Sequence, residues 1–376
     1  MMDLASVVRP GDGIISGQAC AEPQTLLEAL VADRARLSGC RLFLGASYSG
    51  IVKPSHSDHL RLASYGGIGH NRALSDAGVL DVLRVPYSHL AGMIRSGRIP
   101  AEVVFVQVSP PNARGEYSLG LAADYLVPAL ELCRAIVAEV NAQVPWTHTE
   151  RLLRKDDFDL LIESSRLPAA ARNRAVDRAI ARHAASLVPD GSVLEFGVGG
   201  LPDAVCEFLR ERKDLRVHSG TIGDGVADLM AAGAVREVDC AMLIGSRKLF
   251  DFARDNPRIR LRSSEYTHGA DVLRTIERFV AINSAVEVDL LGRVNSEIAG
   301  GSYVGAIGGA PDFIGAAGTS LVLIPAARLV ARLSGPVSTS DAGVVVTEHG
   351  AADLRGCDRD ERARRLRAIA SAHSAI

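Results

Sequence analysis

The stretch from Val193 to Asp203 reads VLEFGVGGLPD, and it joins a short apolar run, a glycine-rich turn and a helix start. The run from Ser192 to Phe196 predicts a buried strand. Pro202 and Asp203 are typical of the first turn of a helix, and we expect this helix to extend to Arg212. A strand, a tight turn and a helix in this order form the repeating unit of an α/β fold.

The same alternation continues along the rest of the chain. Val103–Val108 and Val344–Thr347 are apolar, β-branched runs that predict two more buried strands. The stretch from Pro128 to Glu139 is expected to be a helix. Strands of this kind between helices favour a mostly parallel sheet with helices on both faces.

The chain also repeats itself. Pro10 is followed by Pro23 and Leu30 at the same spacing at which Pro189 is followed by Pro202 and Leu209. A weaker echo pairs the run from Val106 to Ser109 with the run from Val286 to Asp289. Two matches near one offset predict an α/β fold of two duplicated open-sheet domains, residues 1–180 and 181–376. We place the join in the Ala/Arg-rich stretch 164–185, as a linker and a helix.

Composition excludes several classes of protein. The 376 residues carry 42 Lys and Arg against 44 Asp and Glu, so a dedicated nucleic-acid surface is not expected. No apolar run is long enough to span a membrane, and the N-terminus does not resemble a signal peptide. The six cysteines lie far apart, and the spacing of the histidines fits no compact metal site. We therefore expect a cytoplasmic protein without metal, nucleic-acid or membrane partners.

The 36 glycines exceed the usual share, and two clusters of them are candidate ligand sites. The turn Gly197–Leu201 has the form of an anion-binding loop. Pro202 spoils a dinucleotide fingerprint, and the strand at 215–218 lacks the acidic end of an S-adenosylmethionine site. A coenzyme A (CoA) loop and a purely structural turn remain. The cluster from Gly300 to Phe313 could bring backbone amides to a substrate carbonyl, or could form tight turns.

Several further motifs, in order, make the chain resemble the acetyl-CoA hydrolase/transferase family, of the 4-hydroxybutyrate CoA-transferase kind within the class I CoA-transferase superfamily. The matching segments are Phe105–Gly120, Val137–Thr147, Pro189–Val205, Asp224–Leu229, Ala281–Leu290, Gly308–Phe313 and Val346–Gly356. The resemblance implies two domains of the CoA-transferase type, with the CoA loops in the C-terminal one. It also implies an acyl-CoA substrate, no permanently bound cofactor and a homo-oligomer.

The resemblance also suggests roles for individual residues. It implies CoA binding by the first turn, with Gly305 and Gly308 of the second cluster as further candidates, and an oxyanion-binding amide at Gly309. The CoA-binding residues of the first turn are then Gly197, Val198, Gly199, Gly200 and Leu201.

One position departs from the family pattern. Such enzymes use a glutamate that attacks the thioester and becomes a glutamyl-CoA intermediate. His218, Asp224 and Gly225 match residues of the family motif that contains this glutamate. In this alignment, Gly220 stands at the position of the glutamate. We expect the missing side chain to leave space for water or for a bulkier acyl group.

Three hypotheses follow from Gly220. In the first, water attacks a CoA-bound substrate, cleaving a thioester or a β-dicarbonyl C–C bond, with Glu287 or Glu348 as the base. Both glutamates could instead be structural, and His218 could assist proton transfer or be a core histidine. In the second hypothesis the chain binds CoA without catalysis, or is a partner subunit. In the third, CoA transfer survives because another carboxylate, such as Glu265, replaces the missing one.

Overall fold

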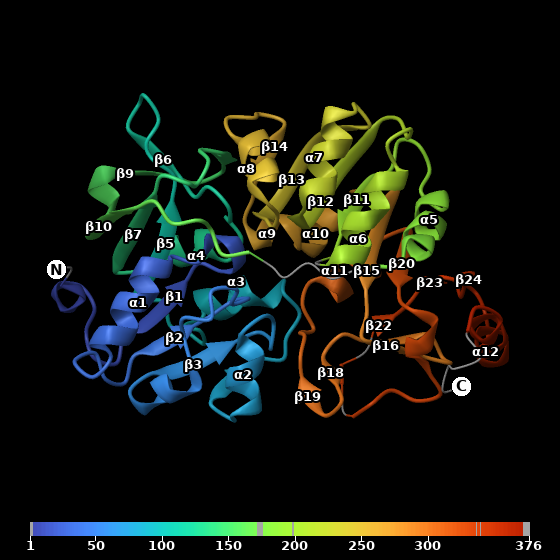
Figure 1. The fold of residues 1–376 in the computed structure, drawn as a ribbon, viewed down its shortest axis with the longest axis horizontal. Helices are drawn as coiled ribbons and strands as arrows, with labels where there is room; N and C mark the ends of the chain where they lie inside the picture. The colour runs from blue at the N-terminus through green and yellow to red at the C-terminus, as the bar shows by residue number, and fades with distance from the viewer. Residues whose placement is uncertain (1–2, 171–175, 198, 336, 339, 371–376) are drawn as a thin grey trace. The chain divides into compact units, whose positions relative to one another are not determined.

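The structure is a computed structural model that describes residues 3–170, 176–197, 199–335, 337–338 and 340–370. The chain forms two compact units (Figure 1). Unit 1 comprises Met1–Ala171 and Ala241–Tyr266, and unit 2 comprises Arg172–Cys240 and Thr267–Ile376. Within the described ranges, no helix is both long enough and apolar enough to cross a membrane.

Unit 1 is built on a seven-stranded sheet with the order β10-β7-β5-β1-β2-β3-β4, in which neighbouring strands are parallel. Its strands are β1 (Gly13–Ser16), β2 (Arg41–Phe43), β3 (Arg61–Ser64), β4 (Leu80–Val82), β5 (Val103–Val108), β7 (Ala135–Asn141) and β10 (Leu160–Ser164). The helices are α1 (Gln24–Asp33), α2 (Asn71–Asp76), α3 (His89–Arg95), α4 (Leu126–Leu132) and α8 (Arg247–Ala253), and α9 (Ser264–Thr267) ends where the chain enters unit 2. β6 (Glu116–Ser118) and β9 (Leu152–Arg154) form a two-stranded antiparallel sheet, and β8 (His148–Thr149) pairs in parallel with β14 (Ile259–Leu261).

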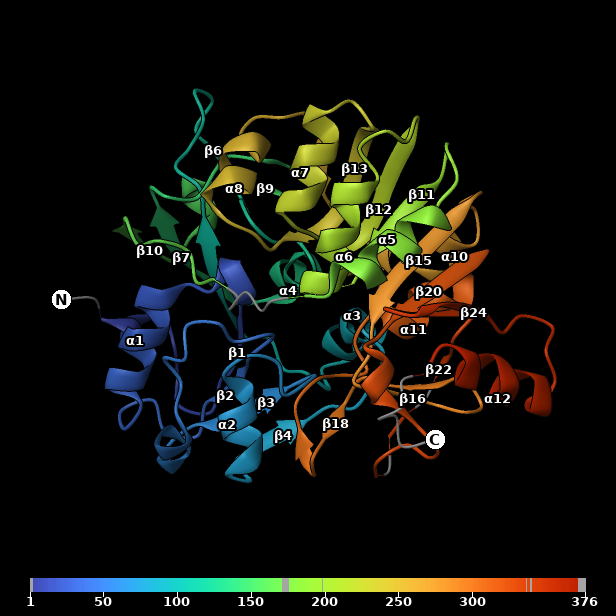
Figure 2. The ribbon, with the colours of Figure 1, turned by 45° about the vertical axis from the view of Figure 1, so that its right-hand side comes forward.

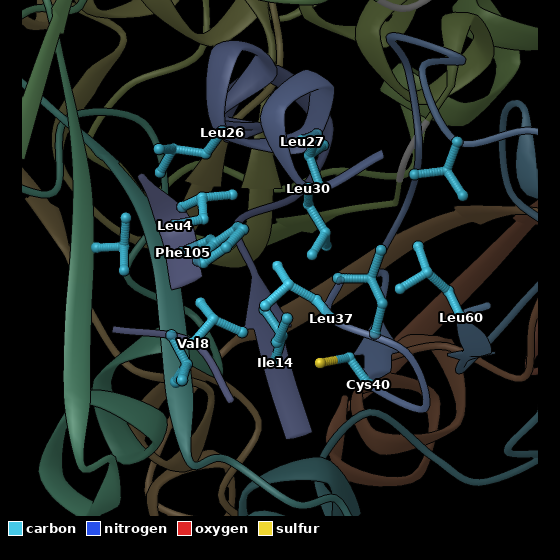
Figure 3. Packing of buried hydrophobic residues seen from close by; sticks show 14 of the residues in the cluster. Leu4, Val8, Ile14, Leu26, Leu27, Leu30, Leu37, Cys40, Leu60 and Phe105 are labelled. Carbon is cyan, nitrogen blue, oxygen red and sulfur yellow. The ribbon is translucent and has the colours of Figure 1, made fainter. Parts of the chain in front are cut away.

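The core of unit 1 lies between α1 and the sheet. Leu26, Leu27 and Leu30 of α1 pack in one cluster with Ile14 of β1 and Phe105 of β5, and none of these side chains is exposed (Figure 3). Replacing one of these leucines with alanine typically costs about 2–5 kcal/mol of stability. This packing fixes the position of β1 against α1.

In unit 2, the strands of the second large sheet follow one another in the order β24-β23-β20-β15-β11-β12-β13. Its strands are β11 (Val193–Phe196), β12 (Leu215–Ile222), β13 (Val235–Leu243), β15 (Phe279–Ser284), β20 (Thr319–Leu323), β23 (Val344–Thr347) and the antiparallel edge strand β24 (Gly350–Asp353). The helices are α5 (Arg178–Ser186), α6 (Gly200–Val205), α7 (Asp224–Ala231), α10 (Ala270–Leu273), α11 (Ala310–Ala316) and α12 (Arg359–Ala368). Helix α5 packs on β20, β23 and β24, and α11 packs on β15 and β20 (Figure 2).

Two small sheets complete unit 2. The first has the order β21-β16-β17-β22, and the second pairs β18 with β19. Their bounds are β16 (Glu287–Asp289), β17 (Arg293–Asn295), β18 (Ile298–Ala299), β19 (Ser302–Tyr303), β21 (Leu329–Val330) and β22 (Ser340–Asp341).

The predicted duplicated α/β architecture is confirmed by the strand orders of the two large sheets. In unit 1, β1 lies between β2 and β5, and in unit 2, β11 lies in the same way between β12 and β15. The first echo, around Pro10 and Pro189, leads into these equivalent strands. The second echo is wrong, because 106–108 belong to the central strand β5 whereas 287–289 form β16 of a small sheet. The strand that takes the place of β5 is β15.

Among the local predictions, the strands at 103–108, 193–196 and 344–347 are confirmed as β5, β11 and β23. The helix expected from Pro128 to Glu139 is wrong beyond Leu132, because β7 begins at Ala135 and every residue of β7 is buried. A strand buried on both faces shows no alternation, so its apolar run resembles that of a buried helix. The helix expected from Pro202 to Arg212 is shorter, since α6 ends at Val205 and a single 3-10 turn follows.

Candidate functional site

The glycine turn follows β11 at the point where the strand order of unit 2 reverses. β12 pairs with one edge of β11, and β15 pairs with the other edge. The loop after β11 and the carboxyl end of β15 therefore lie next to each other, at the end of the sheet where the chain direction diverges. In open parallel sheets, ligands bind beyond the carboxyl ends of the strands at this kind of position. The fold therefore puts the predicted loop where an α/β sheet ordinarily binds a ligand.

The loop passes closely over the end of β15. Gly197 donates its N–H to Ile282 O at 2.8 Å, and a Cβ on Gly197 would collide with Asn283 Oδ1. Gly199 has a φ of 135°, which side chains rarely allow, and Gly200 and Leu201 begin α6. Val198, the remaining residue of the predicted loop, lies outside the described residues. The structure thus brings Gly197, Gly199 and Gly200 together at one strand end.

A buried polar pair that we did not predict from the sequence supports this loop. Asn283 Nδ2 donates to Glu195 Oε2 at 2.7 Å, and Glu195 is 2% exposed. Burial raises the pKa of Glu195 to about 8. Because the amide N–H of Asn283 is directed to Glu195, its oxygen faces Gly197. The sequence did contain a signal for this pair, because Glu195 and Asn283 are each a polar residue inside an otherwise apolar strand.

Gly220 does not border an open space. It lies within β12 rather than beyond its end, and a Cβ placed on it would lie 3.0 Å from both Cε1 and Nε2 of His268. A Cβ placed on Gly309 would lie 2.5 Å from the same Nε2. The expectation of space for water or for a bulkier acyl group is therefore wrong at this point, because the imidazole of His268 fills it.

Buried neighbours fix the orientation of His268, a residue for which the sequence suggested no role. Nδ1 lies 2.9 Å from Thr267 Oγ1, and Nε2 of His218 lies 2.9 Å from the carbonyl oxygen of Thr267. The ring of Phe313 packs against the imidazole, with the two centroids 4.7 Å apart. Burial, with a smaller contribution from the charge of His218, lowers the pKa of His268 to about 3. Burial also lowers the pKa of His218.

The second glycine cluster provides the turn before α11. Gly308 has a φ of 64°, and Gly309 is the N-cap of α11, where its carbonyl oxygen accepts from Asp312 and Phe313 at 3.0 and 3.2 Å. Gly305 lies elsewhere in the cluster, and a Cβ on it would collide with the carbonyl oxygen of Ser296. Of these three residues, Gly309 is the one that adjoins His268.

Glu287 and Glu348, the two predicted bases, have different surroundings. Glu287 accepts from Ser334 N and Oγ at 2.9 and 2.8 Å and from Asn295 Nδ2 at 3.1 Å. Although burial acts to raise its pKa, these hydrogen bonds hold the pKa of Glu287 below its ordinary value. Glu348 directly follows β23 and accepts from Ala326 N at 2.8 Å through Oε2, while its Oε1 lies 4.0 Å from His349 Nε2.

Glu265, the alternative carboxylate, is bound by an arginine of unit 1. Arg95 donates to its two oxygens at 2.8 and 2.7 Å, and this contact lowers the pKa of Glu265. Across the described part of the chain, no group of three or more His, Cys, Asp or Glu side chains is arranged to hold a metal ion.

Comparisons with known proteins agree with this architecture. Residues 1–171 match the family model "Acetyl-CoA hydrolase/transferase N-terminal domain", and residues 245–375 match the corresponding C-terminal domain. The chain is 30% identical to the 4-hydroxybutyrate coenzyme A transferase of Clostridium kluyveri, over 95% of this chain and 90% of the relative. It is 31% identical to an acetyl-CoA hydrolase of Kluyveromyces lactis, over 46% of this chain and 37% of the relative.

A solved structure gives the same result. The crystal structure of RipA from Yersinia pestis superimposes with a TM-score of 0.92 at 26% sequence identity, covering 98% of this chain and 92% of the other. Both the sequence motifs and the fold thus lead to one assignment, and the resemblance is confirmed: the chain belongs to the acetyl-CoA hydrolase/transferase family.

Proposed function

We propose that this acyl-CoA enzyme works by hydrolysis and does not pass CoA between carboxylates. The observation that carries the proposal is the imidazole of His268, which fills the place beside Gly220 where the family pattern puts a glutamate. Without a carboxylate there, no glutamyl-CoA intermediate can form at this position. Water is then the acceptor, and it cleaves a thioester or a β-dicarbonyl C–C bond.

The glycine loop at 197–201 is our candidate for binding the diphosphate or pantetheine of CoA. Its support is its position beyond the carboxyl end of β11, together with the close passage of its backbone over Asn283. Among the two candidate bases, Glu348 fits better than Glu287. Both oxygens of Glu287 accept hydrogen bonds, whereas Glu348 Oε1 faces a histidine ring nitrogen at 4.0 Å.

Thiol release across a panel of acyl-CoA esters, with and without acetate, tests this proposal. We expect thiol release without acetate, no CoA adduct on the protein by intact mass, and loss of activity in Glu348→Gln but not in Glu287→Gln. If thiol release requires acetate or a protein–CoA adduct accumulates, CoA transfer is the activity. If CoA stabilises the protein thermally but no ester is cleaved, the chain is a binding protein.

Two variants test the register at Gly220. In Gly220→Glu the new side chain meets the His268 ring, so we expect no CoA adduct. In Gly220→Glu combined with His268→Gly the ring is removed, and we expect an adduct with acyl-CoA. An adduct in the single variant would show that His268 does not hold this place.

A further inference from the structure

The carboxyl end of β11, which leads into the glycine turn, is held differently on its two edges. On the β15 side, backbone pairing continues to Phe196, which lies opposite Ile282. On the β12 side, the backbone pairs are at Val193 and Leu194. At Phe196, side-chain hydroxyls of β12 contact the backbone of β11.

These hydroxyls belong to Ser219 and Thr221. Ser219 Oγ accepts from Phe196 N at 3.1 Å and from Thr221 N at 3.3 Å. A hydroxyl has a single proton, and that of Ser219 has its shorter contact with Thr221 O, at 2.7 Å, and its longer one with Phe196 O, at 3.1 Å. Thr221 Oγ1 donates to Phe196 O at 3.3 Å. The N–H and the carbonyl of Phe196 are therefore both bound by this hydroxyl pair.

We propose that Ser219 and Thr221 are positioning residues for CoA binding, because their hydroxyls fix the backbone of Phe196 and thereby the direction in which the chain enters the glycine turn. The inference rests on the proposed function, in which that turn binds CoA, and it adds two residues to that function. Both residues act through the backbone of β11, so neither side chain has to reach the ligand.

Burial makes the turn sensitive to these contacts. Ser219 is fully buried, Thr221 is 7% exposed and Phe196 is 4% exposed. A buried backbone N–H that loses its partner is costly, so the strand end shifts until that N–H is bound again. The next residue, Gly197, has no room for such a shift toward β15, because a Cβ on it would lie 2.4 Å from Asn283 Oδ1. The shift therefore displaces the turn.

The hydroxyl of Ser219 also spans Gly220. It contacts both the N–H and the carbonyl of Thr221, the residue that follows this glycine. Side-chain hydroxyls that bond to the backbone two residues further on fix the local chain direction. The hydroxyl pair therefore connects the glycine turn to the strand position at which the family pattern puts its glutamate.

The test measures the affinity of the full-length protein for CoA by isothermal titration. Ser219→Ala removes the acceptor of Phe196 N, and we expect the Kd for CoA to rise roughly tenfold, about 1.4 kcal/mol. In thiol release the KM for acyl-CoA should rise in parallel, with kcat changed less than threefold. Thr221→Val removes a hydroxyl and keeps the branched shape, so the Kd should rise roughly fivefold. Thr221→Ser keeps the hydroxyl and should stay within twofold of the wild type.

Ser192 provides the matched control, because it directly precedes β11 at the opposite end of the strand. It is fully buried, and its hydroxyl donates to Pro189 O at 2.7 Å. Ser192→Ala and Ser219→Ala each remove one buried hydroxyl, so both should lower the melting temperature. Only Ser219→Ala should change the Kd for CoA by more than twofold.

Several outcomes would overturn the inference. One is a CoA affinity that stays at the wild-type value in both Ser219→Ala and Thr221→Val. Another is an equal loss of affinity in Ser192→Ala, since the effect would then follow from stability. A third is an equal loss in Thr221→Ser and Thr221→Val, which would exclude the hydroxyl. If Ser219→Ala does not fold, the two Thr221 variants decide.

Failure of the proposed function gives a different pattern. If the wild type binds CoA but releases no thiol, hydrolysis fails, and the affinities of the variants still decide the role of the hydroxyl pair. If the wild type binds no CoA, the assignment of the glycine turn to CoA fails, and the inference fails with it.

Discussion

Unit 1 places Gln18 beyond the end of β1, and unit 2 places a glycine turn beyond the equivalent end of β11. Gln18 is 1% exposed; its Nε2 donates to Tyr87 Oη and to Asp124 Oδ2, both at 2.7 Å. Its Oε1 accepts from Tyr65 Oη at 2.9 Å and from Ala46 N at 2.8 Å. In unit 1 this strand end is filled by a closed network of buried side chains.

The backbone of unit 1 is strained around that network. Ala19, next to Gln18, has a φ of 51°, and Asp124 has a φ of 22°, although neither residue is glycine. Strain of this kind persists where the surrounding contacts determine the conformation strongly. At the end of β11 the left-handed conformation falls on Gly199 instead, and there are no side chains on Gly197, Gly199 and Gly200 to fill the turn. The two equivalent strand ends thus share their strand order and differ in the side chains that follow them.

The largest expected effect concerns the stability of unit 1. Gln18→Leu removes hydrogen bonds from buried Tyr65, Tyr87 and Asp124, and each unsatisfied buried group costs about 1–3 kcal/mol. We expect a loss of roughly 3–5 kcal/mol in urea-induced unfolding of unit 1, with CoA affinity in calorimetry unchanged within twofold. Gln24→Leu, whose amide donates on the surface to Leu167 O, serves as the control. A loss of CoA affinity in Gln18→Leu would show that the end of β1 also takes part in binding.

The next effect concerns the glycine turn. Gly197→Val puts a branched side chain against Asn283 and moves the loop away from β15, so we expect CoA affinity to fall roughly 100-fold, about 2.8 kcal/mol. Isothermal titration with CoA measures the change. Gly315→Ala is the matched control, because a Cβ there meets no atom within 4 Å. Unchanged affinity in Gly197→Val would place the CoA site elsewhere.

The smallest effect is on the pH dependence of stability. Because burial raises the folded-state pKa of Glu195 from 4.5 to about 8, its contribution is full below pH 4.5 and is lost as the pH rises through 8. The melting temperature of the wild type should fall between pH 6.5 and 9. Glu195→Gln should flatten this fall, by about 2–4 °C for each kcal/mol involved.

Asp124 of unit 1 provides the comparison for that experiment. Burial raises the pKa of Asp124 to about 6. The stability that Asp124 contributes to the folded protein is therefore lost largely at pH values below the range in which Glu195 acts. Asp124→Asn should therefore keep most of the fall between pH 6.5 and 9. If Asp124→Asn flattens the curve and Glu195→Gln does not, the buried acid that controls stability in this range belongs to unit 1.

Much of the framework could be predicted from local sequence patterns. The strand, turn and helix start at 193–203 and the duplication around Pro10 and Pro189 depend on neighbouring residues, and the structure reproduces them. The strand at 135–141 was missed because both of its faces are buried, which removes the alternation that distinguishes a strand. The Glu195–Asn283 pair was missed because its members lie on different strands, β11 and β15.

The sequence by itself determined the α/β class, the family motifs, the glycine turn after β11 and the presence of glycine at position 220. Only the tertiary structure decided that residues 241–266 pack with unit 1 and that His268 lies against Gly220 and Gly309. The physical reason is that turns and strand starts follow from the conformational preferences of adjacent residues. A contact between a ring and two distant glycines depends instead on how β12, α11 and the segment after α9 pack, and no local periodicity encodes that packing.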